Sequence, residues 1–149
     1  MQAESVINLR LSLAAGSLLV QVVNRASTAL ELWELENSWG WYSFSVHLRG
    51  RGRGERVVIE RSSRDWTRNI PSRVTIAPRG TWDVRLNIRD GWWNEPRGLN
   101  DLRHEAVLVH VVYSVARTRE SDEFGVVVGT TGSNEVISSP PHEWLPIEK

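Results

Sequence analysis

The stretch Thr81-Trp-Asp-Val-Arg-Leu-Asn-Ile88 alternates strictly between polar and apolar side chains. In a β-strand successive side chains point to opposite faces, so the four apolar residues would share one face and their polar neighbours the other. An α-helix would scatter the same residues around its axis, because its period is 3.6 residues. The stretch therefore predicts a strand with one face in a core and the other in solvent.

The same alternation recurs along the chain in short runs separated by turn-forming residues. We expect further strands at residues 7–13, 18–23, 41–48, 56–60, 73–77, 106–115 and 124–130. One segment allows two interpretations. Thr28-Ala-Leu-Glu31 has the spacing of a helix capping box, whereas Leu30 and Leu32 alternate as in a strand. The window is short for a helix and lies between strands, which favours the strand.

Eight or nine short strands without a long helix predict an all-β protein, a single antiparallel β-sandwich. A parallel α/β sheet would not give strands with one solvated face. We assign residues 1–138 to the sandwich and 139–149 to an irregular Pro-rich tail, which Trp144 and Leu145 could pin to the body. The predicted core consists of Leu9, Leu11, Val20, Val22, Tyr42, Phe44, Val46, Trp82, Val84, Leu86, Val109, Val111 and Tyr113.

Length and charge limit the partners that the protein is expected to have. The chain has 149 residues, which suits one domain, and its 18 Lys and Arg balance its 18 Asp and Glu. Binders of nucleic acid or of anionic membranes usually carry a large excess of positive charge, so we expect neither partner. The chain contains no long apolar run, and Met1–Ser5 lacks the charge of a secretory signal. We expect a cytoplasmic protein, and the sequence leaves its oligomeric state open.

Metal and cofactor chemistry has little support in the sequence. The absence of Cys excludes disulfides, thiolate nucleophiles and Cys-ligated metals. His104 and His110 would share a face of one continuous strand but lie about 20 Å apart. No other pair of the four His has close ligand spacing. We expect no metal and no cofactor.

No catalytic residue stands out either. The sequence lacks a G-x-S-x-G elbow, an S-x-x-K motif and a Gly-rich loop that opens a helix. Asp65, Asp83, Asp90 and Asp101 fall in or near loops, where an acid–base pair would form only by convergence in space. We expect a protein that is not an enzyme. The run Arg49–Gly54 is similar to the Arg-Gly segments of RNA-binding proteins, but three charges in a neutral chain favour a soluble hairpin connection.

The loop Asp90-Gly-Trp-Trp-Asn-Glu-Pro-Arg-Gly98 presents two adjacent tryptophans among turn-forming residues. Flat aromatic side chains can anchor a partner protein or stack on a sugar ring, because they give much contact area at a low cost in entropy. Alternatively, one or both could fold back over the core. The candidate binding residues are Trp92, Trp93, Arg89, Arg97 and Asn94.

Three motifs carry a resemblance to a known family. They are Val20-Gln-Val-Val-Asn24 with a following Ser27, Tyr42-Ser-Phe-Ser-Val46, and Ile76-Ala-Pro-Arg-Gly80 before a Trp-containing strand. Between about residues 18 and 86 the chain resembles the bacterial intracellular proteinase inhibitors, although Arg79 splits the Pro-Gly pair of that family. The resemblance implies an immunoglobulin-like sandwich and, by analogy of fold, binding to a proteinase.

The expected function is non-catalytic binding of another protein through the loop tryptophans, with inhibitor-like action implied by the resemblance. Two alternatives remain open. In one, the same tryptophans stack on sugar rings while Asn94, Asp90 or Glu95 bonds the hydroxyls. In the other, the domain is purely structural and both tryptophans are buried.

Overall fold

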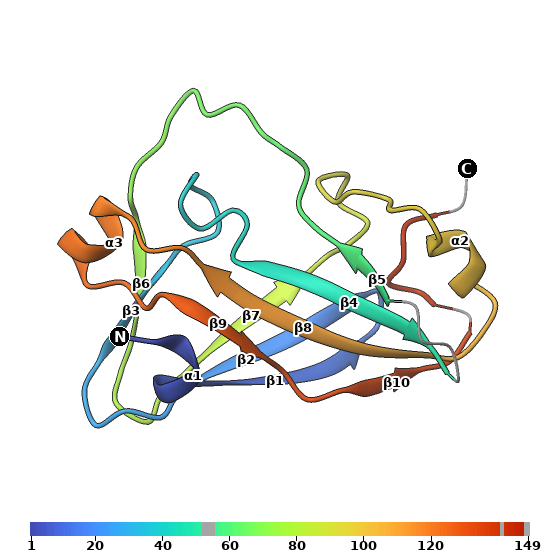
Figure 1. Ribbon diagram of the computed structural model, residues 1–149, viewed down its shortest axis with the longest axis horizontal. Coiled ribbons are helices and arrows are strands. Elements are labelled where there is room, and N and C mark those ends of the chain that lie inside the picture. The colour runs from blue at the N-terminus through green and yellow to red at the C-terminus, as the bar shows by residue number, and fades with distance from the viewer. Residues whose placement is uncertain (52–55, 141, 148–149) are drawn as a thin grey trace.

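The computed structural model describes residues 1–51, 56–140 and 142–147 (Figure 1). Within them the protein is all-β, with several antiparallel sheets that form no closed barrel and three short helices. The elements are α1 (Ala3–Val6), β1 (Ile7–Ala14), β2 (Ser17–Asn24), β3 (Leu30–Trp33), β4 (Phe44–Gly50), β5 (Arg56–Ile59), β6 (Arg73–Ile76), β7 (Thr81–Leu86), α2 (Leu99–Leu102), β8 (Val107–Val115), α3 (Arg119–Phe124), β9 (Gly129–Gly132) and β10 (Val136–Ser138).

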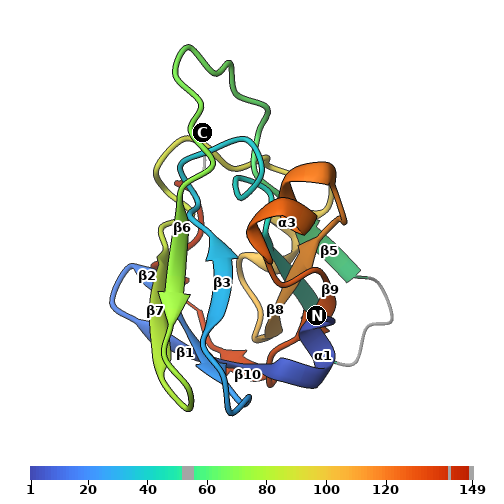
Figure 2. The same ribbon diagram turned by 90° about the vertical axis from the view of Figure 1, so that its left-hand side faces the viewer.

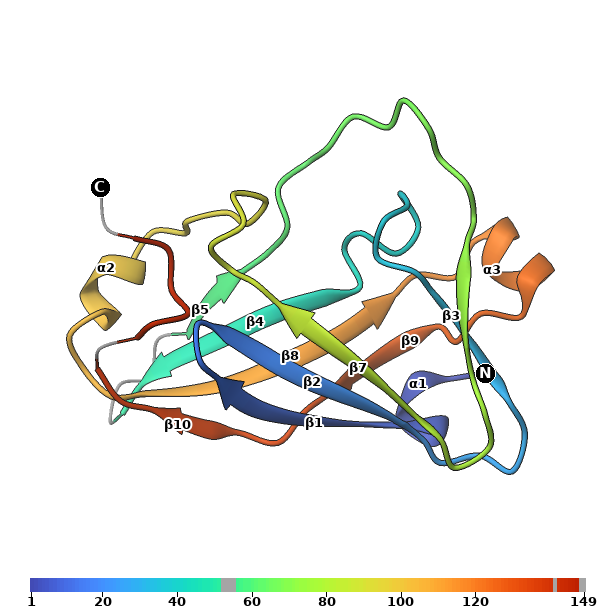
Figure 3. The same ribbon diagram turned by 180° about the vertical axis from the view of Figure 1, so that it is seen from behind.

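Two larger sheets carry most of the core. One has the strand order β1-β2-β7, and the other has the order β10-β8-β4-β5 with β9 also paired to β8. Figures 1 and 3 show the first sheet lying along the second from opposite sides of the molecule. The strands β3 and β6 form a separate two-stranded sheet at one end, visible face-on in Figure 2. This end also carries α3 and the long connection from β5 to β6.

Strict alternation along β7 is confirmed. Val84, Leu86 and Ile88 are buried, whereas Asp83, Arg85 and Asn87 are exposed. All the predicted core residues except Tyr42 and Trp82 are buried on the inner faces of the two larger sheets. Trp82 is half-buried and packs beside Phe44, with 6.5 Å between ring centroids. The period of two therefore identified the buried faces correctly.

Tyr42 is a correction to the predicted core, because 51% of its surface is exposed. The strand was expected to begin at Trp41, but β4 begins at Phe44. The preceding residues form turns in which the Trp41 amide donates to the Asn37 carbonyl and the Ser43 amide donates to the Gly40 carbonyl. A turn breaks the alternation, so Tyr42 does not share the face of Phe44.

The strand expected at residues 124–130 is wrong in its first half. Residues Arg119–Phe124 form α3, and only Gly129–Gly132 forms a strand, β9. Thr118 and Ser121 cap the helix reciprocally through their side chains and backbone amides. Gly125 then ends it in the left-handed conformation, with φ 65°. These polar and glycine signals outweigh the apolar run Val126–Val128 that suggested a strand.

Two other expectations concern the ambiguous segment at residues 28–31 and the C-terminal segment. The strand β3 (Leu30–Trp33) begins within the ambiguous segment, in agreement with the strand interpretation. In the C-terminal segment the side chains of Trp144 and Leu145 are buried, with exposed fractions of only 3% and 1%. Residues 141, 148 and 149 of the expected tail, and residues 52–54 of the Arg-Gly run, lie outside the described residues.

Candidate functional site

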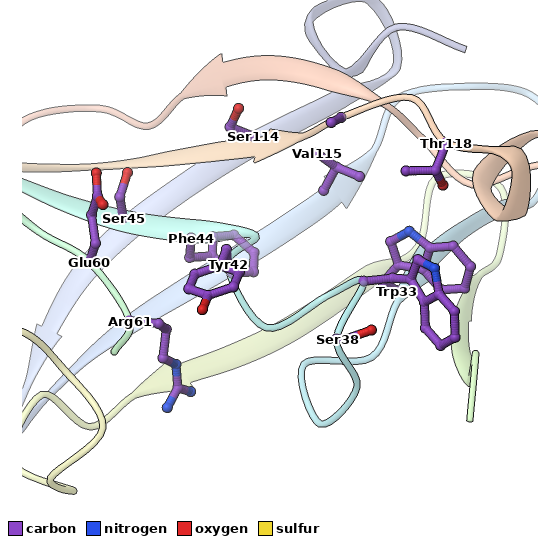
Figure 4. Close-up of a pocket in the computed structure, with 12 residues that line it drawn as sticks. Trp33, Ser38, Tyr42, Phe44, Ser45, Glu60, Arg61, Ser114, Val115 and Thr118 are labelled. Atoms are coloured by element: carbon purple, nitrogen blue, oxygen red, sulfur yellow. The ribbon is translucent and has the colours of Figure 1, made fainter. Parts of the chain in front are cut away.

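A cleft of about 540 Å³ opens where β4 begins, β8 ends and β5 runs into the long connection to β6 (Figure 4). Aromatic rings and hydroxyl groups line it, with the Glu60 side chain beside Ser45, whereas the Arg61 side chain points away from both (Figure 4). The lining residues are Trp33, Ser38, Trp39, Tyr42, Phe44, Ser45, Glu60, Arg61, Ser114, Val115, Ala116 and Thr118.

The turn before β4 places the aromatic side of the cleft. Asn37 is fully buried, and its side chain accepts from the Gly40 amide and donates to the Ser72 carbonyl. Only glycine fits at position 40, because a Cβ there would lie 2.0 Å from the Glu34 carbonyl oxygen. This packed turn directs Tyr42 outwards, so that its ring stands in the cleft (Figure 4).

Apolar and polar groups divide the cleft between them. Trp39 is half-buried and stacks on the buried Trp33, with 5.6 Å between ring centroids. Tyr42 adds an exposed ring. Hydroxyl groups come from Ser38, Ser45, Ser114 and Thr118. Such a mixture suits a ligand that has both apolar faces and several hydrogen-bonding groups.

Arg61 is held rigidly at the cleft wall. Its guanidinium carbon lies 4.1 Å from the centroid of the Trp41 ring and 4.5 Å from that of Trp93. One guanidinium nitrogen is 3.3 Å from a carboxylate oxygen of Asp90. Burial lowers the pKa of this guanidinium, while Asp90 and Glu36 act in the opposite direction. Stacking and pairing together fix the orientation of a charge that is only 10% exposed.

The stacking continues outwards from Arg61. Arg64 lies over Trp41 at 4.9 Å, over Trp66 at 4.7 Å and over Trp92 at 5.3 Å, and it pairs with Glu36 at 3.0 Å. We call this assembly the aromatic–arginine cluster. Its members are Trp41, Arg61, Arg64, Trp66, Trp92 and Trp93. The cluster ties the long β5–β6 connection to the loop after β7.

The two adjacent tryptophans of that loop have different environments. Trp92 is 42% exposed, whereas Trp93 is only 6% exposed and packs on Arg61. An antiparallel bridge joins Trp93 to Arg61, and the Asn94 amide donates to the Glu60 carbonyl at 2.8 Å. The loop therefore supports the cleft through Arg61, and Trp92 is the tryptophan that it presents to solvent.

The other candidate binding residues, Asn94, Arg89 and Arg97, make contacts in different parts of the molecule. Asn94 is exposed and accepts from the Ser62 hydroxyl at 3.1 Å. Arg89 donates to the Leu145 carbonyl at 2.6 Å, so it faces the C-terminal segment rather than the cleft. Arg97 is exposed and lines a separate hollow around α2. Trp93 therefore contacts Arg61, which lines the cleft, but does not line the cleft itself. Arg89 and Arg97 do not line the cleft either.

Sequence reasoning missed the residues that line the cleft. Tyr42 was assigned to the core, and Trp39, Glu60 and Arg61 were not singled out. One signal was present, because two arginines and a tryptophan (Arg61, Arg64 and Trp66) lie close together in a polar segment that is rich in turn-forming residues. Their partners lie about 20 to 30 residues away along the chain, so no local pattern showed the contacts.

Metal-binding groups do not gather in the described residues, where no set of three His, Cys, Asp or Glu side chains could hold an ion. His47 and His110 do meet, from β4 and β8, with ring centroids 4.8 Å apart. His104 lies before β8 and not on it, so the expected common face with His110 is wrong. In the cleft, Glu60 is the one carboxylate among the lining residues.

Comparison with known proteins gives no relative: no protein-family model, no curated protein and no solved structure matches this chain. None of the helices in the described residues is long and apolar enough to cross a membrane.

Proposed function

We propose that the protein is a non-catalytic recognition module that binds a saccharide in the cleft between β4, β8 and the start of the β5–β6 connection. The observation that carries this proposal is the exposed ring of Tyr42 in one cleft with Glu60, Arg61 and four hydroxyl groups. Sugars present apolar C–H faces, which stack on aromatic rings, and hydroxyl groups, which need donors and acceptors nearby.

The charged groups suit hydroxyl recognition. The Glu60 carboxylate can accept several hydrogen bonds from hydroxyl groups, and charge-assisted bonds are about twice as strong as neutral ones. Arg61 is oriented before any ligand arrives, because Trp41, Trp93 and Asp90 hold it. Such preorganisation lowers the entropic cost of binding. One carboxylate alone in the cleft gives no acid–base pair, which favours binding over glycoside hydrolysis.

The strand order supports an immunoglobulin-like sandwich as the scaffold of this site. The strand orders β1-β2-β7 and β10-β8-β4-β5 are compatible with the two sheets of such a sandwich, in which Greek-key connections link the strands. In such sandwiches, loops at one end carry the recognition residues. The cleft lies beside the start of β4 and the end of β8, a position that fits this proposal (Figure 4).

A protein partner is the second candidate, and the exposure of Trp92 favours it. This ring lies at the outer end of the aromatic–arginine cluster, with Asn94 and Arg97 also exposed in the same loop. Aromatic and arginine side chains of this kind dominate protein interfaces. Proteinase inhibition is the specific form of this candidate that the family resemblance implies, and inhibition assays on a panel of serine proteinases test it.

The test of the first candidate is titration with soluble oligosaccharides built from glucose, mannose, galactose or N-acetylglucosamine, followed by calorimetry and by two-dimensional NMR. We expect one of them to bind saturably and to shift resonances of the cleft. Tyr42→Ala and Glu60→Gln should each weaken that binding about tenfold or more.

Trp92→Ala is the matched control, because it removes an exposed aromatic ring outside the cleft. It should leave saccharide affinity unchanged and weaken binding to a protein partner instead. If no oligosaccharide binds, or if Trp92→Ala reduces the affinity as much as Tyr42→Ala does, the cleft is not the saccharide site.

A further inference from the structure

A second cavity, of about 460 Å³, lies between the end of α2 and the C-terminal segment. These two parts of the chain run beside each other in both Figure 1 and Figure 3. The cavity is separate from the saccharide cleft and shares no lining residue with it. Its lining residues are Arg89, Arg103, His104, Pro140, His142, Leu145, Pro146 and Ile147.

Two arginine side chains that line this cavity are each anchored to the C-terminal segment. The Arg89 Nε donates to the Leu145 carbonyl at 2.6 Å, and an Arg103 Nη donates to the carbonyl of Pro146. These acceptors belong to consecutive residues of the C-terminal segment, so one short stretch of chain anchors two arginine side chains that line the same cavity. Arg103 is fixed further by its Nε, which donates to the Asn100 side chain at 2.7 Å.

Neither charge is neutralised by the described residues, among which no carboxylate lies within ion-pairing distance of Arg89 or Arg103. Several other arginines have such a partner: Arg49, Arg61, Arg64, Arg73 and Arg117. A guanidinium group has five N–H donors, and the hydrogen bonds above use only some of them. Two cations that line one cavity and keep spare donors are suited to bind a multiply charged oxyanion.

The other residues that line the cavity offer contacts for a ligand larger than a simple ion. The exposed imidazole of His104 adds ring nitrogens that make no hydrogen bond within the described residues. His142 contributes none, because its nitrogens are already bonded to the Ser138 hydroxyl and the Glu105 carbonyl. Pro140 and Ile147 supply apolar surface. The cavity is many times the volume of a water molecule, about 30 Å³, so it has room for an organic group beside the anion.

We propose that this cavity is a binding site for a small phosphomonoester. Arg89 and Arg103 bind the phosphate oxygens, and the organic group lies against Pro140 and Ile147. A phosphate fits better than a carboxylate, because it carries more charge and enough oxygen atoms to accept from both guanidinium groups at once. The proposal does not depend on saccharide binding at the other cleft, and neither result decides the other.

The test uses the whole chain and four probes at matched ionic strength: phenyl phosphate, inorganic phosphate, benzoate and sodium chloride. Calorimetry measures affinity, and NMR follows the Arg Nε–Hε resonances. We expect phenyl phosphate to bind saturably and more tightly than inorganic phosphate or benzoate, with the Arg89 and Arg103 signals shifting together. Shifts that sodium chloride reproduces, or tighter binding of benzoate than of phenyl phosphate, would overturn the proposal.

Variants separate the site from the C-terminal segment that it holds. Arg89→Gln removes the charge and keeps an amide donor at the Nε position for the Leu145 carbonyl. Arg103→Gln removes the charge and keeps a donor for Asn100, but it loses the bond to the Pro146 carbonyl. Each should weaken phenyl phosphate binding about tenfold or more. Arg97→Gln, an exposed arginine outside the cavity, is the control and should change nothing. His104→Ala does not touch the segment and should weaken binding a few-fold. Unchanged affinity in all three cavity variants, or an equal loss in the control, contradicts the site.

Discussion

His47 and His110 stack on each other across β4 and β8, with ring centroids 4.8 Å apart and planes inclined by 29°. The His47 Nε2 is bonded to the Ser45 hydroxyl at 3.0 Å. Burial is the largest cause that lowers the pKa of both imidazoles from the ordinary value of 6.5. The charges of His110 and then Arg56 lower the pKa of His47 further, and those of Arg56 and Arg49 lower the pKa of His110. Glu135 acts in the opposite direction on His110 without reversing the shift. The folded protein therefore favours two neutral rings.

Stability should depend on pH through this pair. The unfolded chain binds protons at a higher pH than the folded chain does, because its imidazoles keep their ordinary pKa near 6.5. The contribution of the pair to the free energy of unfolding should be fully present above this pH. It should be lost as the pH falls from there towards the lowered pKa values of the folded state. Urea denaturation at intervals between pH 8 and pH 5 measures the slope.

His110→Phe keeps an aromatic ring but removes one titrating group, so it should flatten that slope. His104→Gln, which changes an exposed histidine outside the sheets, is the control and should leave the slope intact. A slope that His110→Phe does not alter would mean that other groups cause the pH dependence.

Trp92 and Trp93 should differ sharply in their effect on stability. Trp93 is buried against Arg61, so Trp93→Ala should cost about 3–5 kcal/mol of unfolding free energy. Trp92 makes an edge contact with Trp41 and is 42% exposed, so Trp92→Ala should cost about 1 kcal/mol. Chemical denaturation measures both, and each variant is the natural control for the other. Equal losses would contradict the division of this loop into a supporting and a presented ring.

Much of the sheet structure was accessible from sequence because period-two alternation reports directly on which face is buried. The strands β1, β2, β7 and β8 each have this period, and their inner residues are buried as predicted apart from Trp82, which is half-buried. The alternation fails where a turn or a cap intervenes. Tyr42 was misplaced by the turn before β4, and the start of the expected last strand was misread because Thr118 and Gly125 shape a helix there.

The cleft was less predictable, because its residues meet only through tertiary structure. Arg61 lies between Trp41 and Trp93. Trp41 belongs to the turn before β4, Arg61 follows β5, and Trp93 belongs to the loop after β7. The pairing of His47 with His110 likewise depends on the register of β4 against β8. One sequence shows which residues are unusual, such as adjacent tryptophans, but it does not show their partners across the sheet.

The helix α3 should depend on its caps. Thr118→Ala removes the hydroxyl that accepts from the Ser121 amide at 3.0 Å, which should cost about 1 kcal/mol of unfolding free energy. Gly125→Ala forces a side chain into φ 65°, which should cost about 1–2 kcal/mol. Thr67→Ala, in the exposed β5–β6 connection, is the control and should be neutral. Losses below about 0.3 kcal/mol at both capping positions would show that packing alone maintains the helix.

The stacking of Arg61 on Trp93 should appear as a coupling energy. We expect Arg61→Met and Trp93→Leu to be non-additive by about 1–2 kcal/mol of unfolding free energy, because the guanidinium group is largely desolvated between two rings. Loss of the Asp90 ion pair cancels from this cycle, since Arg61→Met removes it in both backgrounds. The control cycle combines Trp93→Leu with Arg97→Met, whose exposed side chain stacks on none of the described rings, and should be additive. A coupling energy as small as that of the control would mean that Trp93 fills space beside Arg61 without holding its charge at the cleft wall.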